Sequence, residues 1–141
     1  LIEFLKKTNP NLTDVDLKLN YTRVLCGFKI PGLKNLKIEK PVNKLDIKPT
    51  LTYLAGIKDG FSLGTNMFGK KDFICLNNER IISSRYYYDE KWYDIYTGEE
   101  VDMKKIDENT KEMLDRYYYD MKMELDISNS VSINNLLKDE V

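Results

Sequence analysis

Apolar and polar residues alternate in the first third of the chain as they do in a β-strand. The alternation covers residues 23–30, and its apolar positions are Val24, Cys26, Phe28 and Ile30. A period of two is typical of a half-buried strand, and Pro31-Gly32 is a turn signal directly after it. The pattern therefore predicts a strand that ends in a turn.

A helix is predicted over residues 46–55. Asp46 stands where an N-cap is needed, Pro49 falls in the first turn, and Gly56 can end the helix in the left-handed conformation. Residues 64–69 begin and end with glycine and are interpreted as a loop. A helix end is predicted over residues 1–7, and residues 11–20 and 33–43 are interpreted as polar connections.

From residue 71 onward the pattern changes to short strands. They are predicted over residues 72–77, 80–88, 91–97 and 99–103, which makes a small antiparallel meander of three or four strands. A long helix is predicted over residues 104–125, because its apolar residues recur at three- and four-residue steps. These residues are Ile106, Thr110, Met113, Leu114, Tyr117, Met121 and Leu125. A break is expected at residues 128–130, and a shorter helix carrying Ile133, Leu136 and Leu137 is expected after it.

Aromatic residues gather on neighbouring predicted strands. They are Tyr86, Tyr87, Tyr88, Trp92, Tyr93 and Tyr96. Alternation places Tyr86 and Tyr88 on one face with Ile82, and Tyr87 on the other face with Arg85. We expect one face to pack under the long helix, since cross-strand aromatic pairs stabilise sheets by about 0.2–1 kcal/mol each. The alternative is a platform for a sugar or polyol chain, for which the candidate binding residues are Arg85, Tyr87, Trp92 and Tyr93.

Composition narrows the chemistry. The 141 residues suit one domain, and the formal net charge of −1 gives no reason to expect a nucleic-acid partner. The sequence contains no histidine, which excludes a Ser-His-Asp or Cys-His arrangement and any zinc site that uses histidine. Cys26 and Cys75 fall in predicted strands without metal-like spacing and are expected to be buried thiols. The carboxylates of Asp14 and Asp16 are interpreted as part of a solvated loop.

The order of strand, Pro-Gly turn, helix and glycine loop resembles the C-terminal part of the sulfatase-like phosphoglycerol transferases, the lipoteichoic acid synthase type within the alkaline phosphatase superfamily. In that family a strand ends in Ile-Pro-Gly, an Asp-x-x-Pro-Thr helix ends in Leu-x-Gly, and a Gly-Thr loop with a phenylalanine follows. The residues at matching places are Asp46, Ile47, Pro49, Thr50, Leu54, Gly56, Gly64, Thr65, Met67 and Phe68. The resemblance covers residues 18–138, and Leu25, Lys44 and Leu45 depart from the family pattern.

The resemblance implies an α/β fold with an α+β C-terminal part. Residues 1–69 would be the end of a sulfatase-like α/β core and supply its terminal strand and helix. Residues 70–141 would form a subdomain in which a small antiparallel sheet is packed under the long helix. The chain would then be a fragment of a longer protein, with the upstream catalytic half of that protein as its partner.

The function implied is the transfer of glycerol phosphate from a phospholipid to a cell-envelope polymer or glycan, at the extracytoplasmic face of a bacterial cell membrane. The family's threonine nucleophile and its metal ligands, which hold manganese or magnesium, match no residue here. The resemblance therefore implies no catalytic residue, no metal ligand and no cofactor in this segment. It implies a soluble, inactive, supporting piece whose parent reaches the membrane through N-terminal spans.

Two alternatives and one consequence remain open. The parent could be a sulfuric ester hydrolase, since the residue that separates the two chemistries lies outside the chain. The segment could instead be a non-catalytic module that binds glycans or polyol phosphates on its aromatic sheet face. If the strand at residues 24–30 lacks its neighbours, its apolar face needs other cover, and a homodimer of the fragment is expected.

Overall fold

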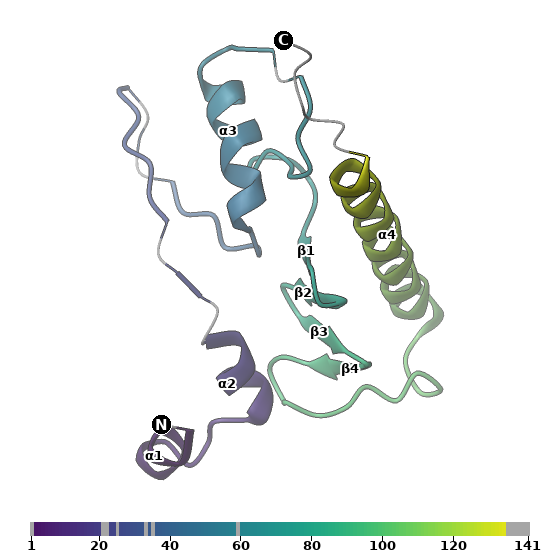
Figure 1. Cartoon of the computed structure of the whole chain (residues 1–141). Coiled ribbons are helices and arrows are strands. Elements are labelled where there is room, and N and C mark those ends of the chain that lie inside the picture. The colour runs from purple at the N-terminus through teal and green to yellow at the C-terminus, as the bar shows by residue number, and fades with distance from the viewer. Residues whose placement is uncertain are drawn as a thin grey trace.

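The computed structural model describes residues 2–20, 23–24, 26–32, 34, 36–58 and 60–134, and shows a mixed α+β fold (Figure 1). The helices are α1 (Ile2–Thr8), α2 (Asp14–Asn20), α3 (Ile47–Leu54), which follows a 3-10 turn at Lys44–Asp46, and α4 (Glu108–Ile133). The strands are β1 (Phe73–Leu76), β2 (Arg80–Ser83), β3 (Tyr86–Asp89) and β4 (Lys91–Asp94). The predicted N-terminal helix and antiparallel sheet are confirmed.

The sheet is a meander in which each strand pairs antiparallel with the next, in the order β1-β2-β3-β4. Its register places Ile81 opposite Tyr88, and Tyr88 opposite Trp92. These side chains therefore share one face, and α4 covers it. The buried residues between sheet and helix are Phe73, Ile81, Tyr86, Trp92, Leu114, Tyr117 and Met121. The prediction that one aromatic face packs under the long helix is confirmed.

Polar contacts fix α4 over this core. The Tyr117 hydroxyl donates to Asp72 over 2.8 Å, and the Tyr117 ring lies 4.3 Å from that of Phe73. Lys71 pairs with Glu124, and Lys122 pairs with Glu79 across 2.7 Å. Each pair joins α4 to the segment around β1, so the helix is held along the edge of the sheet where the two are in contact.

The predicted strand at residues 23–30 is wrong. The described residues of this segment form no strand, and the Val24 side chain is 87% exposed. A strand is stable only when its N–H and C=O groups pair with a neighbour, and the described residues offer this segment none. The turn at Pro31-Gly32 is present, with Gly32 at φ +79°. Cys26 is exposed rather than buried, for the same reason.

Residues 80–88 form two strands rather than one. The Ser83 hydroxyl accepts hydrogen bonds from the backbone N–H groups of Arg85 and Tyr86 and donates to the Tyr86 carbonyl. This turn reverses the chain and changes the alternation, so Ile82 pairs with Tyr87 and lies on its face rather than with Tyr86 and Tyr88. The predicted strand at residues 99–103 is reduced to an isolated bridge between Glu100 and Tyr93.

Two helix predictions also need correction. Residues 14–20 form α2 rather than a polar connection, because Thr13 caps it: its hydroxyl accepts from the Asp16 N–H, while the Asp16 carboxylate accepts from the Thr13 N–H. The long helix begins at Glu108, after Asp107 as N-cap, and continues through residues 128–130 to Ile133. No glycine or proline follows Gly98, and serine and asparagine lower helix propensity only modestly. The helix expected at Leu136 and Leu137 lies outside the described residues.

Candidate functional site

The motif residues at α3 form one buried hydrogen-bonded unit. Asp46 precedes α3, and its carboxylate accepts from the N–H of Asn43 at 2.9 Å and from the N–H of Thr65 at 2.8 Å. Thr50 is fully buried, and its hydroxyl donates to the Asp46 carbonyl and accepts from the Met67 N–H at 2.9 Å. The helix and the glycine loop are thus bound to each other by two side chains.

The prediction of a helix here is confirmed, but its cap differs. Asn43 caps the 3-10 turn, because its side chain accepts from the Leu45 N–H. Asp46 completes a capping box and makes no cap hydrogen bond to α3 itself. Gly56, at φ +66°, follows the helix end as predicted. The signal that sequence reasoning missed is the Asn-x-x-Asp spacing one turn earlier.

Gly64 occupies a place where no side chain fits. A Cβ at this position would lie 2.1 Å from the carbonyl oxygen of Leu45 and 2.7 Å from the Asp46 nitrogen. Backbone atoms cannot yield as the end of a flexible side chain can. The glycine therefore allows the loop to approach α3 closely enough for Asp46 to reach Thr65.

A second feature lies between α2 and the face of the sheet opposite α4. A groove of about 410 Å³ is lined by Asp14, Val15, Leu17, Lys18, Tyr87, Tyr93 and Gly98. The rings of Tyr87 and Tyr93 are 6.3 Å apart. Gly98 lets α2 come close, because a Cβ there would lie 2.5 Å from side-chain atoms of Thr13. Two of the four candidate ligand residues thus meet at this groove.

Asp89 lies beside Tyr87 and accepts hydrogen bonds from three side chains. Its carboxylate accepts from Lys18 at 2.6 Å, from Arg80 at 2.9 Å and from the Tyr87 hydroxyl at 3.2 Å. Burial alone would raise the pKa of the Asp89 carboxyl, but the hydrogen bonds from Lys18 and Arg80 outweigh it and hold the pKa below its ordinary value. Burial, together with the nearby Asp89 charge, raises the pKa of Tyr87 to about 12.

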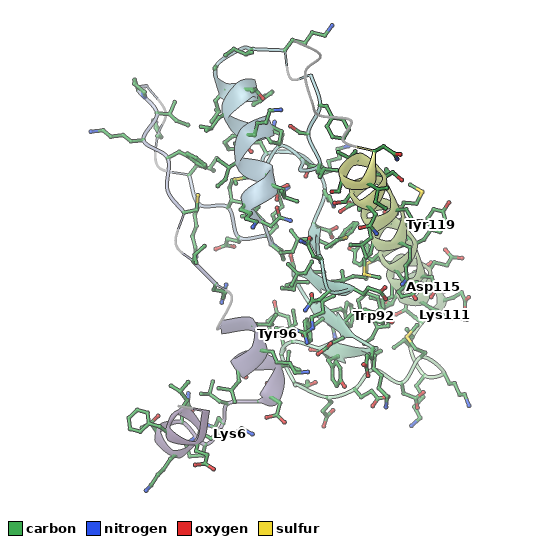
Figure 2. The ribbon with its side chains drawn as sticks, in the orientation of Figure 1. Lys6, Trp92, Tyr96, Lys111, Asp115 and Tyr119 are labelled. Atoms are coloured by element: carbon green, nitrogen blue, oxygen red, sulfur yellow. The ribbon has the colours of Figure 1, made fainter. Side chains whose placement is uncertain are left out.

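The other two candidate ligand residues lie elsewhere. Trp92 faces α4 and is only 7% exposed, and Figure 2 shows it between the strands and α4. Arg85 lies in the turn between β2 and β3, where its guanidinium donates to Asp94 at 3.1 Å. The four residues do not converge on one surface. That any of them binds a ligand stays a prediction.

Neither a metal-ion site nor a membrane-spanning helix is evident in the part of the chain that the structure describes. No group of three or more Cys, Asp or Glu side chains there is arranged to hold a metal ion. Among the same residues, no helix combines the length and the hydropathy that a bilayer span requires. The geometry that remains is a buried hydrogen-bond network at α3 and a groove beside α2.

Comparison with known proteins identifies the relatives. Lipoteichoic acid synthase 2 of Bacillus subtilis (strain 168) is 28% identical over 132 residues, which are 90% of this chain and 19% of that protein. Lipoteichoic acid synthase 1 of the same organism is 30% identical over 121 residues, 82% of this chain and 18% of that protein. The chain is thus similar in sequence to lipoteichoic acid synthases over most of its own length. It spans about a fifth of the length of the curated relatives that it matches.

Neither a family model nor a solved structure matches the chain. The resemblance to the lipoteichoic acid synthases is nevertheless confirmed by both relatives, over more than four fifths of the chain. Five of the residues on which the resemblance was argued are linked in the structure: Asp46, Thr50, Gly64, Thr65 and Met67. In this chain they hold a helix against a loop.

Proposed function

We propose that this chain is the C-terminal segment of a membrane-anchored, sulfatase-like phosphoglycerol transferase. The complete enzyme would move glycerol phosphate from a phospholipid to a cell-envelope polymer or glycan at the extracytoplasmic face of a bacterial membrane. A divalent manganese or magnesium ion, held upstream of this segment, would supply Lewis-acid chemistry. The relationship to two lipoteichoic acid synthases carries the proposal.

Within that enzyme the segment supports rather than reacts. Residues 1–69 would end the sulfatase-like α/β core, and residues 70–141 would form a C-terminal subdomain. The hydrogen-bond network of Asp46 and Thr50 is consistent with this role, because all its partners are backbone groups or the Thr65 side chain. The side chains of Asp46 and Thr50 are thus bonded to groups of the chain itself, and neither is directed toward a substrate.

Exposed apolar side chains on and around α3 indicate that another surface binds this part of the chain. Large apolar side chains are exposed on α3 and in the segments around it; they are Leu45, Leu51, Tyr53, Ile57, Phe61 and Phe68. The rings of Tyr53 and Phe68 lie 6.2 Å apart, and exposed apolar side chains that gather in this way are typical of an interface. The upstream catalytic half of the same protein is the proposed cover, since the relatives are about five times longer than the matched region.

The proposal is tested with the full-length gene product in vesicles that contain phosphatidylglycerol and manganese. We expect the complete protein to release diacylglycerol and form polyglycerol phosphate, and the 141-residue chain alone to give no turnover. Turnover by the chain alone would contradict the supporting role. Release of sulfate from aryl sulfates by the complete protein, without polymer, would instead identify a sulfuric ester hydrolase.

The groove beside Tyr87 and Tyr93 favours a second candidate, a module that binds glycans or polyol phosphates. A volume of about 410 Å³ falls within the range of small-molecule sites, and Lys18, paired with Asp89, lies in its lining. Calorimetric titration with glycerol phosphate oligomers tests it. Saturable binding that is lost in Tyr93→Ala but kept in Tyr96→Ala, a tyrosine exposed outside the groove, would support the module. Absence of binding to the folded chain would reject it.

A further inference from the structure

Charge is distributed unevenly along the chain. Residues 23–44, called the basic segment below, contain six Lys or Arg residues and a single acidic residue, Glu39. Residues 70–141 contain eleven Lys or Arg residues and seventeen Asp or Glu residues. The formal charges of these two regions are therefore +5 and −6, although the net charge of the whole chain is only −1. A nearly neutral protein thus has one basic part and one acidic part.

Most cations of the basic segment are exposed and form no ion pair with a described residue. These cations are Arg23, Lys29, Lys34 and Lys44. Lys37 pairs with Glu39 at 3.0 Å, but both side chains are exposed, and a pair of this kind contributes little. After residue 70, by contrast, most of the described cations pair with a carboxylate, as Arg80 does with Asp89. The positive charge of the basic segment is therefore available to an external anion.

The basic segment lies apart from the acidic part of the chain. Figure 1 shows it as the dark blue trace on the side of α3 that faces away from β1 and α4. The Lys40 ammonium donates to the Gly69 carbonyl, which joins the segment to the end of the glycine loop. The described residues between 23 and 43 form no helix or strand. The cations therefore follow an extended path along one side of the molecule.

An apolar side chain lies among these cations. Leu36 is 64% exposed, and Lys34 and Lys37 stand on either side of it in the sequence. A soluble anion would gain nothing from this leucine, whereas the boundary between the headgroups and the acyl chains of a bilayer can bury it. Four to eight Lys or Arg residues close together are also typical of segments that bind anionic lipid surfaces.

We propose that the basic segment binds the surface of a bilayer that exposes anionic phospholipid headgroups. Leu36 enters the headgroup region, the lysines contact the phosphates, and the acidic α4 side faces away from the lipid. This contact does not use the apolar side chains around α3, so those remain available to the upstream half of the protein. It is a property of the chain alone and does not depend on the transferase activity of the complete protein.

Flotation of the 141-residue chain with lipid vesicles tests the contact. We expect the chain to float with vesicles of phosphatidylcholine and phosphatidylglycerol, and not with vesicles of phosphatidylcholine alone. Binding should disappear at about 1 M salt, where the Debye length falls to about 3 Å. Because the net charge of the chain is −1, attraction to an anionic surface requires that its charges be segregated. A chain that does not float with the phosphatidylglycerol vesicles at low salt overturns the proposal.

Two matched double variants locate the contact. Lys34→Gln/Lys44→Gln and Lys104→Gln/Lys105→Gln each remove two exposed cations, so their net charges are equal. One lysine near an anionic surface contributes about fivefold in affinity. The first variant should therefore bind phosphatidylglycerol vesicles roughly 25-fold more weakly, and the second should bind them like wild type. Circular dichroism checks that both fold. Equal weakening of the two variants overturns the proposal.

Soluble glycerol phosphate oligomers separate a lipid surface from a phosphate polymer. At equal phosphate concentration they should displace the chain poorly from the vesicles, and Leu36→Ser should weaken vesicle binding several-fold, because it removes an apolar side chain that the bilayer buries. If the oligomers compete as well as the vesicles and Leu36→Ser binds vesicles like wild type, the partner is a phosphate polymer and the proposal is wrong. Turnover by the complete protein tests the proposed function separately, since flotation uses the chain alone.

Discussion

The Thr50 hydroxyl should determine how firmly the glycine loop is held. Thr50→Val keeps the shape of the side chain and removes the oxygen that accepts from the Met67 N–H at 2.9 Å. Thr50 is fully buried and Met67 is buried, so water cannot replace the lost acceptor. A buried donor without a partner costs about 1–3 kcal/mol. The Asp46 carbonyl is the other partner of this hydroxyl. It remains close to the backbone N–H groups of α3, so the loss of the hydroxyl there adds little to the free-energy cost.

Hydrogen exchange at the Met67 amide measures this effect directly. A loss of about 1–3 kcal/mol corresponds to a fall in protection of roughly 5- to 150-fold. Thr50→Ser is the matched control, because it keeps the hydroxyl and loses a methyl group worth about 0.8 kcal/mol. The reasoning is refuted if Thr50→Val and Thr50→Ser expose the Met67 amide equally, or if the serine variant exposes it more.

Three further changes test other contacts. Gly64→Ala forces a methyl group into backbone and should lower the urea midpoint by the equivalent of about 1–3 kcal/mol, whereas Gly60→Ala, which meets no atom within 4 Å, should change it little. Asp89→Asn should destabilise the fold at neutral pH. The folded-state pKa of Asp89 lies below its unfolded value of 3.8, so its contribution is present above that value and disappears as the pH falls through the folded pKa; the urea midpoints of variant and wild type should therefore converge in acid. Burial raises the pKa of the Cys75 thiol to about 12, so iodoacetamide near neutral pH should modify the exposed Cys26 and leave Cys75 until the chain unfolds.

The helices and the sheet could be predicted where pattern and local chemistry agree. The long helix has a stripe of apolar residues that ends up buried against the sheet, and Leu114, Tyr117 and Met121 are its innermost members. The helix at α3 combines an early proline with a glycine just past its end, and both signals act within one turn. Each of these features depends on residues that are close together in the sequence, so the sequence of one chain is enough to predict it.

The turn at Ser83 could not be predicted from alternation. It depends on one hydroxyl that satisfies backbone groups two and three residues later, and serine is also common in strands and loops. Its consequence is large, because it moves Ile82 to the opposite face of the sheet. Alternation does place Trp92 and Tyr93, adjacent in β4, on opposite faces of the sheet, but it cannot show which helix covers each face. The hydrogen bond between Asp46 and Thr65 could not be predicted either, because it forms only when the loop folds back against α3.

The wrong strand at residues 23–30 and the exposed apolar side of α3 have one explanation if the proposed function holds. A strand pattern describes what a segment can do when a neighbour supplies hydrogen bonds, and it persists in the sequence whether or not that neighbour is present. Val24 and Phe28 alternate as strand residues and yet are exposed. Tyr53 on α3 and Ile57, which follows the end of that helix, are exposed as well. Apolar side chains rarely remain uncovered in such numbers on one part of a protein unless another surface normally buries them. In the complete enzyme, the same upstream sheet would pair the strand and cover the helix, whereas the α4 core, whose partners all lie within residues 72–125, is already closed.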